Sequence, residues 1–258
     1  MSSTVAVPAG AASLRGPFRL AVACLVMNAV TILKGAMTTS TGSGMAYPDW
    51  PLSDGQVMPE SSYTTVPGFL EHFHRLAALT LGLLALALAI WVTRQRLGDR
   101  RLRRCAWLGG TMILAQAVLG GTRVLNQTPA LNSAAPGPLA QLVFAMFAWI
   151  AYQLSDRYRA TAPLREVAPG AGRKLMLFAL GILVVQTVIG ALARHTNSPH
   201  ALWTHVGNSF VVFVVGAIAT AFAVGRLSAA PGVRGLARAI VTLLIVQIVL
   251  GFVVLAIR

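Results

Sequence analysis

The sequence contains 258 residues, of which 56% are hydrophobic and only 11% are charged. About a quarter of the residues in a soluble domain are charged, so this composition excludes an ordinary soluble domain and indicates a membrane protein. The formal net charge of +14 at pH 7 would by itself suit nucleic-acid binding, but the basic residues are grouped between apolar segments. We therefore interpret them as topology signals and contacts for anionic lipids, and expect no nucleic-acid partner.

Seven segments are long and apolar enough to cross a membrane as helices. In chain order they cover residues 18–37, 69–93, 106–125, 137–155, 174–193, 202–224 and 236–256. The alternation of apolar and polar positions that is typical of a membrane β-barrel does not appear. The first segment is interpreted as a span and not as a signal peptide, because no convincing cleavage site follows it. The sequence thus predicts an all-α, polytopic membrane bundle of seven transmembrane helices built from repeated helical hairpins.

Arginine and lysine residues are concentrated in the even-numbered connections between these helices. These connections contain Arg94, Arg96, Arg100, Arg101, Arg103, Arg104, Arg157, Arg159, Arg165, Arg173, Lys174, Arg226, Arg234 and Arg238. By the positive-inside rule, the N-terminus is cytoplasmic and the odd-numbered connections face outward, in the cell inner (plasma) membrane. We expect a cytoplasmic tail (1–17), an N-terminal four-helix half (18–155), a cytoplasmic linker (156–173) and a C-terminal half of three helices (174–258).

A short motif recurs late in three odd-numbered helices. Its copies are Gln116-Ala-Val-Leu-Gly120, Gln186-Thr-Val-Ile-Gly190 and Gln247-Ile-Val-Leu-Gly251, and a weaker version ends at Gly35. A glycine at one depth lets neighbouring backbones approach closely, and a glutamine there can hydrogen-bond across helices. The repeats predict successive hairpins, which leaves the seventh helix without a partner. We interpret an eighth helix as lost.

Glu71, His74 and Arg75 begin the second predicted helix and are costly in lipid unless they are used, paired or hydrated. Glu71 lies one turn before His74 on the same helix face. Imidazoles from bundle helices commonly hold haem iron, and a carboxylate one turn away could orient the ring or take part in acid–base chemistry. His205 starts the sixth helix, and the alternative for it is an interfacial histidine bonded to water or a headgroup.

Other polar residues near the same membrane face are weaker candidates. His72 is interpreted as a loop-edge residue. Arg194, His195 and His200 lie in the short fifth connection, where they could meet the propionates of a cofactor or be solvated loop residues. The first connection contains many glycines and prolines, and a loop of about thirty residues in a tightly connected protein is more often functional than idle.

The first connection and the helix after it resemble a known family. The run from Gly42 to Pro51 (Gly-Ser-Gly-Met-Ala-Tyr-Pro-Asp-Trp-Pro), followed by Glu71-x-x-His74-Arg75, resembles the haem A synthase family (CtaA type). The Gln-x-Val-Leu-Gly endings are also similar to that family's later helices. The resemblance implies an eight-helix bundle of two similar halves, which oxidises a methyl group of haem O to the formyl group of haem A for cytochrome oxidase assembly.

The resemblance also implies roles for single residues. By motif, Glu71 is the expected catalytic residue, and His74 and His205 are the expected iron ligands, for haem O as substrate and for haem b. Arg75 and Arg194 are expected to bind the cofactor. Expected partners are haem, membrane lipids, a haem O synthase and cytochrome oxidase assembly factors, and a homo-oligomer is left open.

The chain departs from the family pattern in three ways. Pro136 stands where a second N-terminal histidine is expected, and Gln141 lies more than a turn beyond it. The eighth helix, which would bring the last histidine, is expected to be lost, and Ser53 stands where some members carry a cysteine. Each haem therefore keeps only one of its expected ligands. Two alternatives to the oxidoreductase stay open: an assembly protein of the same family that binds or delivers haem without oxidising it, and a small-molecule transporter without haem, which we rank last.

Overall fold

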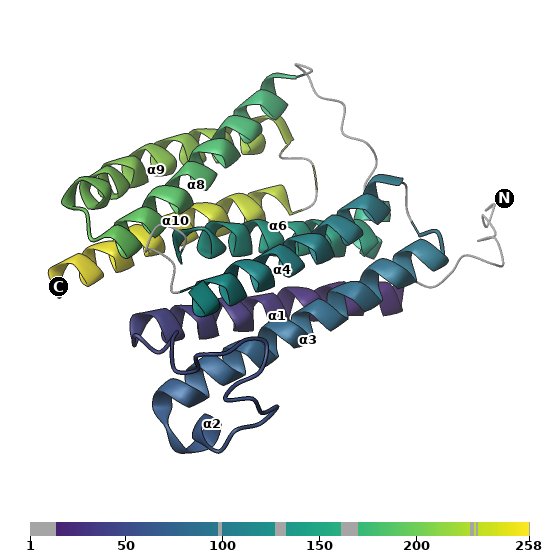
Figure 1. Ribbon diagram of the computed structural model, residues 1–258. Helices are drawn as coiled ribbons and strands as arrows, with labels where there is room; N and C mark the ends of the chain where they lie inside the picture. The colour runs from purple at the N-terminus through teal and green to yellow at the C-terminus, as the bar shows by residue number, and fades with distance from the viewer. Residues whose placement is uncertain are drawn as a thin grey trace. The chain divides into compact units, whose positions relative to one another are not determined.

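The structure is a computed structural model that describes residues 14–97, 100–126, 133–160, 170–227, 230 and 232–257. Within these residues every regular element is a helix, which confirms the predicted all-α fold (Figure 1). The helices are α1 (Arg15–Ser40), α2 (Ser61–Thr64), α3 (Val66–Arg94), α4 (Arg100–Asn126), α6 (Pro136–Leu154), α7 (Asp156–Ala160), α8 (Ala171–Thr196), α9 (Pro199–Leu227) and α10 (Val233–Ala256). Residues 1–13 of the expected N-terminal tail and residues 161–169 of the expected linker lie outside the described residues.

Seven of these helices, α1, α3, α4, α6, α8, α9 and α10, are long and apolar enough to cross a membrane. They coincide with the seven predicted segments, and most extend a few residues further at one or both ends. The largest extension is in α4, which begins at Arg100 and not at residue 106. An apolar segment marks only the part of a helix that suits hydrocarbon, whereas arginine is a good helix former and continues the helix into the polar interface.

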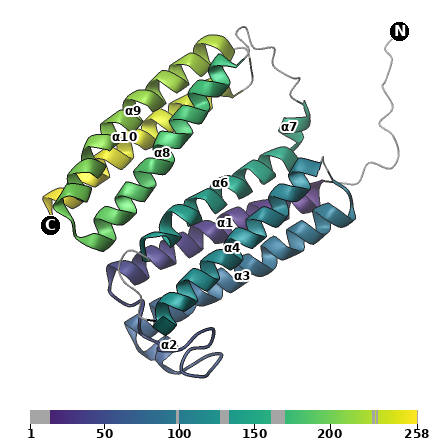
Figure 2. The same cartoon turned by 45° about the horizontal axis from the view of Figure 1, so that its top comes forward.

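The chain divides into two compact units, residues 1–161 and 162–258. In the first unit, α1 packs against α3 and α6, and α4 packs against the same two helices, so the four form a closed bundle (Figure 2). Its interior is apolar, with Leu88, Val143, Phe147 and Ile150 fully buried. The buried side chain of Asn28 adds a polar link, because its Nδ2 donates to the carbonyl oxygen of Ala140 at 3.4 Å.

In the second unit, α9 packs against both α8 and α10. The connection between α8 and α9 consists of Asn197 and Ser198 alone, and Asn197 adopts the left-handed conformation with φ 50°. The connection between α1 and α3 is much longer, since it covers residues 41–65 and contains α2. We call residues 41–60 the first loop. Gly42 makes its first turn with φ 68°, a conformation that favours glycine.

Candidate functional site

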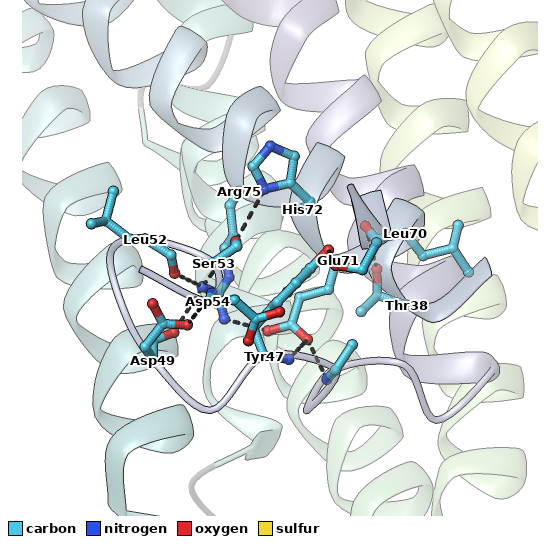
Figure 3. Close-up of polar contacts among 12 residues, drawn as sticks. Thr38, Tyr47, Asp49, Leu52, Ser53, Asp54, Leu70, Glu71, His72 and Arg75 are labelled. Carbon is cyan, nitrogen blue, oxygen red and sulfur yellow. Dashed lines mark hydrogen bonds and ion pairs between the residues drawn. The ribbon is translucent and has the colours of Figure 1, made fainter. Parts of the chain in front are cut away.

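The carboxylate of Glu71 is buried at the start of α3 and is held by the first loop (Figure 3). Its Oε2 accepts hydrogen bonds from the backbone N–H groups of Ala46, at 2.6 Å, and Tyr47, at 3.2 Å. Its Oε1 forms an ion pair with Arg75, one turn later on the same helix. The expected catalytic carboxylate therefore also has a structural role, because its hydrogen bonds hold the first loop on α3.

The guanidinium of Arg75 makes further contacts with the first loop. Its Nη1 donates to the backbone carbonyl of Asp49 at 2.8 Å and to that of Leu52 (Figure 3). Its Cζ lies 5.6 Å from the centre of the buried Tyr47 ring. The cation that was expected to bind a cofactor thus has an ion pair and several loop contacts in this structure.

His72 is buried, so its interpretation as a loop-edge residue is wrong. Its side chain is only 4% exposed, and its Nδ1 lies 3.0 Å from the hydroxyl of Ser53, which is itself buried (Figure 3). The first loop folds back over α3 and covers this face of the helix, which a helix pattern alone does not reveal. The Nε2 of His72 is buried and has no hydrogen-bond partner in the described part of the chain.

His74 faces α1, where its imidazole lies against Gly35. A Cβ atom added at Gly35 would lie 2.9 Å from Cε1 of His74, closer than side-chain carbons approach one another. The Nδ1 of His74 is buried and has no hydrogen bond of normal geometry to a described residue, although the backbone of Thr31 in α1 lies near the ring. Near this contact, Thr38 donates from its hydroxyl to the carbonyl of Leu70, at 3.1 Å, and so ties α1 to the turn of α3 before His74.

His205 has the corresponding position in the second unit. Its imidazole lies against Gly190 of α8, where an added Cβ would be 2.7 Å from its Cε1. Its Nδ1 is also buried and lacks a partner among the described residues. Gln186 links the two helices here: its Nε2 donates to the backbone carbonyl of His205 at 3.0 Å, and its Oε1 accepts from Asn208 at 2.8 Å. This confirms that a glutamine of the repeated motif hydrogen-bonds across helices.

The remaining candidates lie at helix ends or are exposed. Pro136 is the first residue of α6, and Gln141 is exposed, so Gln141 does not point into the bundle as a substitute ligand. Arg194 lies in the last turn of α8 and is exposed. Within the described ranges, no group of three or more His, Cys, Asp or Glu residues is arranged to hold a metal ion.

The first loop is also anchored on α4. The Trp50 ring covers Gly121, where an added Cβ would lie 2.5 Å from its Cδ2. Asp49 shapes the same part of the loop, because its carboxylate accepts the N–H groups of Asp54 and Gly55, both at 2.8 Å. Partial burial alone would raise the pKa of Asp49. The two N–H groups and the Arg75 guanidinium outweigh that effect and hold this pKa below its ordinary value of 3.8.

A known protein family matches most of the chain. The COX15-CtaA family, described as cytochrome oxidase assembly proteins, matches residues 18–211. The match runs from near the start of α1 into the first half of α9. The chain belongs to this family. Together with the seven long apolar helices, family membership indicates a multi-pass membrane protein.

Several curated relatives are named heme A synthase. The relative from Symbiobacterium thermophilum is 29% identical over 78% of this chain, and that from Bacillus licheniformis is 29% identical over 65%. The relative from Methylobacterium sp. (strain 4-46) is 34% identical over 54% of this chain. The alignments span 67%, 55% and 41% of the lengths of these three relatives. No solved structure matches the chain.

Proposed function

We propose that this chain is a haem A synthase-like membrane oxidoreductase, which converts the methyl group of haem O to the formyl group of haem A for cytochrome oxidase assembly. The observation that carries the proposal is the pair of imidazoles, His74 and His205. Each lies against a glycine of the facing helix and has a buried Nδ1 without a partner among the described residues. Membership of the cytochrome oxidase assembly family and the relatives named heme A synthase support it.

The two histidines fit haem as a ligand. In each ring the nitrogen that is buried without a partner among the described residues is Nδ1. Nε2 is the less hindered ring nitrogen and is the one that would bind haem iron. We propose that His74 holds the substrate haem O and that His205 holds haem b, whose iron, when bound, supplies one-electron redox chemistry. Axial ligation of haem needs only one or two imidazoles, so it does not require a group of three His, Cys, Asp or Glu residues, which the described part of the chain lacks.

The other site residues act on the surroundings of His74. Glu71 is the proposed catalytic carboxylate, and Arg75 keeps it in place through their ion pair. Both also fasten the first loop to the turn of α3 that carries His74. From the arginine distribution, we propose the cell inner membrane, a cytoplasmic N-terminus and histidine sites near the outer face.

A second candidate function is haem binding or delivery without oxidation. Two observations favour it: the proline at position 136 leaves His74 without the second histidine that the family pattern predicts, and Gln141 is exposed. In addition, both oxygens of Glu71 are engaged by the loop and by Arg75, as a purely structural carboxylate would be.

Production of haem A in a strain that lacks its own haem A synthase but makes haem O separates the two candidates. Haems extracted from cells that express the chain are resolved by chromatography, beside His74→Ala, Glu71→Gln and the control Arg104→Gln, an exposed arginine of α4. The oxidoreductase predicts haem A in the wild type and control, and a loss of at least about tenfold in both site variants. Purified protein with bound haem but no haem A product would instead establish the binding function.

A further inference from the structure

Arg123 lies in the last turn of α4, and the proposed function assigns no role to it. Its side chain is half-buried, and within the described residues its guanidinium forms no hydrogen bond or ion pair. A guanidinium has five N–H donors in a planar fork that matches a carboxylate or a phosphate. A partly desolvated guanidinium with these donors unused is unfavourable in a membrane protein, so an anionic partner is expected.

The surroundings of Arg123 place it near the His74 site. A Cβ added at Gly44 would lie 3.4 Å from Nη1 of Arg123 and 3.7 Å from Cγ2 of Thr38, so both side chains meet the first loop at the same point. Thr38 follows Gly35 by one turn of α1, and Gly35 is the residue against which His74 packs. Along the helix axis, the guanidinium therefore lies about one helical turn beyond the contact between Gly35 and His74, toward the end of the bundle that the first loop covers.

The other two cations at this end of the first unit are already engaged. Arg75 pairs with Glu71 and donates to carbonyls of the first loop. The Lys34 amine lies 4.2 Å from the centre of the Phe69 ring, a cation–π contact. Arg123 is thus the cation of this region with its donors still available, as judged over the residues that the structure describes.

We propose that Arg123 binds a carboxylate of the tetrapyrrole that His74 holds. The inference rests on the proposed function, since it concerns the same ligand. A haem is apolar over most of its surface and carries its two propionate carboxylates on one edge, which favours an orientation with that edge toward the polar end of the helices. A phospholipid phosphate offers similar chemistry, and the experiment must separate these two sources of negative charge.

The test compares haem b with its dimethyl ester, in which both carboxylates are uncharged. Each is titrated into haem-depleted, detergent-purified full chain, and binding that depends on His74 is obtained from the difference between wild type and His74→Ala. We expect the wild type to bind the free acid about tenfold more tightly than the ester, and Arg123→Gln to reduce this ratio to about twofold or less. The charge-conserving Arg123→Lys should keep most of the ratio, which also shows that the position tolerates substitution.

Arg104→Gln is the matched control, because it removes an exposed arginine from the opposite end of the same helix. An unchanged ratio in Arg123→Gln, with haem binding still dependent on His74, would overturn the inference and leave the proposed function standing. The same holds if Arg123→Gln lowers only the co-purifying phospholipid phosphorus, since the partner is then a headgroup. If His74→Ala loses no haem, the proposed haem site fails, and this inference fails with it.

Discussion

The imidazole of His74 and the backbone of Gly35 are in direct contact, and His205 and Gly190 repeat that contact in the second unit. In each case a glycine late in one helix leaves the space that the histidine of the next long helix fills. Two glycines and two histidines far apart in the sequence thus make the same local structure twice, as expected for a duplicated hairpin. Because the same contact occurs twice, it can be tested by the same substitution in each unit.

Gly35→Ala and Gly190→Ala should each displace a histidine ring. The added carbon would lie 2.9 Å from His74 in the first variant and 2.7 Å from His205 in the second, so the ring or the helix must move. We expect each variant to lose about half of the haem that the wild type binds, because each disturbs one of two proposed sites. Bound haem per protein, from the pyridine haemochrome spectrum, measures the effect.

Two further glycines serve as controls for this pair. At Gly120 and Gly181, no described atom outside the local helix lies within 4 Å of an added Cβ. Gly120→Ala and Gly181→Ala should therefore retain wild-type haem content, and replacing glycine by alanine within a helix should stabilise it by up to about 1 kcal/mol. Equal haem loss in all four variants would show that the histidine contacts are not the cause.

Gln186→Ala should loosen the second unit, whereas Gln247→Ala should not. Gln186 makes two hydrogen bonds to α9, but Gln247 is exposed although it occupies the same position in the motif. We expect Gln186→Ala to lower the free energy of unfolding by about 1 kcal/mol and to weaken haem binding at His205. Thermal unfolding in detergent and haem retention after gel filtration report these effects, and equal behaviour of the two variants would contradict the assignment.

Glu71→Gln should release the first loop in addition to any effect on chemistry. The substitution removes the ion pair with Arg75 and weakens the contacts to the N–H groups of Ala46 and Tyr47. A loss of about 2 kcal/mol is expected for these charged contacts. Proteinase K should then cut within residues 41–60 faster than in the wild type. If haem A production falls while the cleavage rate stays unchanged, the role of Glu71 is catalytic alone.

Asp49 should make the first loop sensitive to acid. Because its pKa is lower in the folded loop than its ordinary value of 3.8, its contribution to stability is complete above that value and is lost as the pH falls through the lower folded pKa. Cleavage of the loop by pepsin, normalised to an unfolded substrate, should accelerate as the pH falls below about 4. Asp49→Asn should be cleaved faster than the wild type above about pH 4, and this difference should shrink as the pH falls.

Much of the fold could be predicted from sequence, because membrane spans depend on local composition. All seven long helices were predicted, and the motif ending at Gly190 correctly indicated a close helix contact with a glutamine bridge. The motif did not indicate which copies would make such a bridge. Gln247 occupies the same motif position as Gln186 but is exposed, because the burial of a motif position depends on which helix packs opposite.

The site was less predictable where it depends on the first loop. His72 and Ser53 are nineteen positions apart, and no helical or strand periodicity relates a loop to the helix that it covers. Arg123 gave a weak signal, as one of the few basic residues outside the even-numbered connections. Its packing against Gly44 required the three-dimensional arrangement of α4 and the loop.

The unequal connections before the two histidines have a consequence for folding order. Residues 41–65 separate α1 from α3, but only Asn197 and Ser198 separate α8 from α9. The entropy cost of closing a loop grows with its length, so the longer connection costs more to close than the shorter one. The short connection between α8 and α9 is therefore enough to align Gly190 with His205. The alignment of α1 with α3 depends in addition on the contacts that Glu71 and Arg75 make with the first loop and on the hydrogen bond from Thr38 to Leu70.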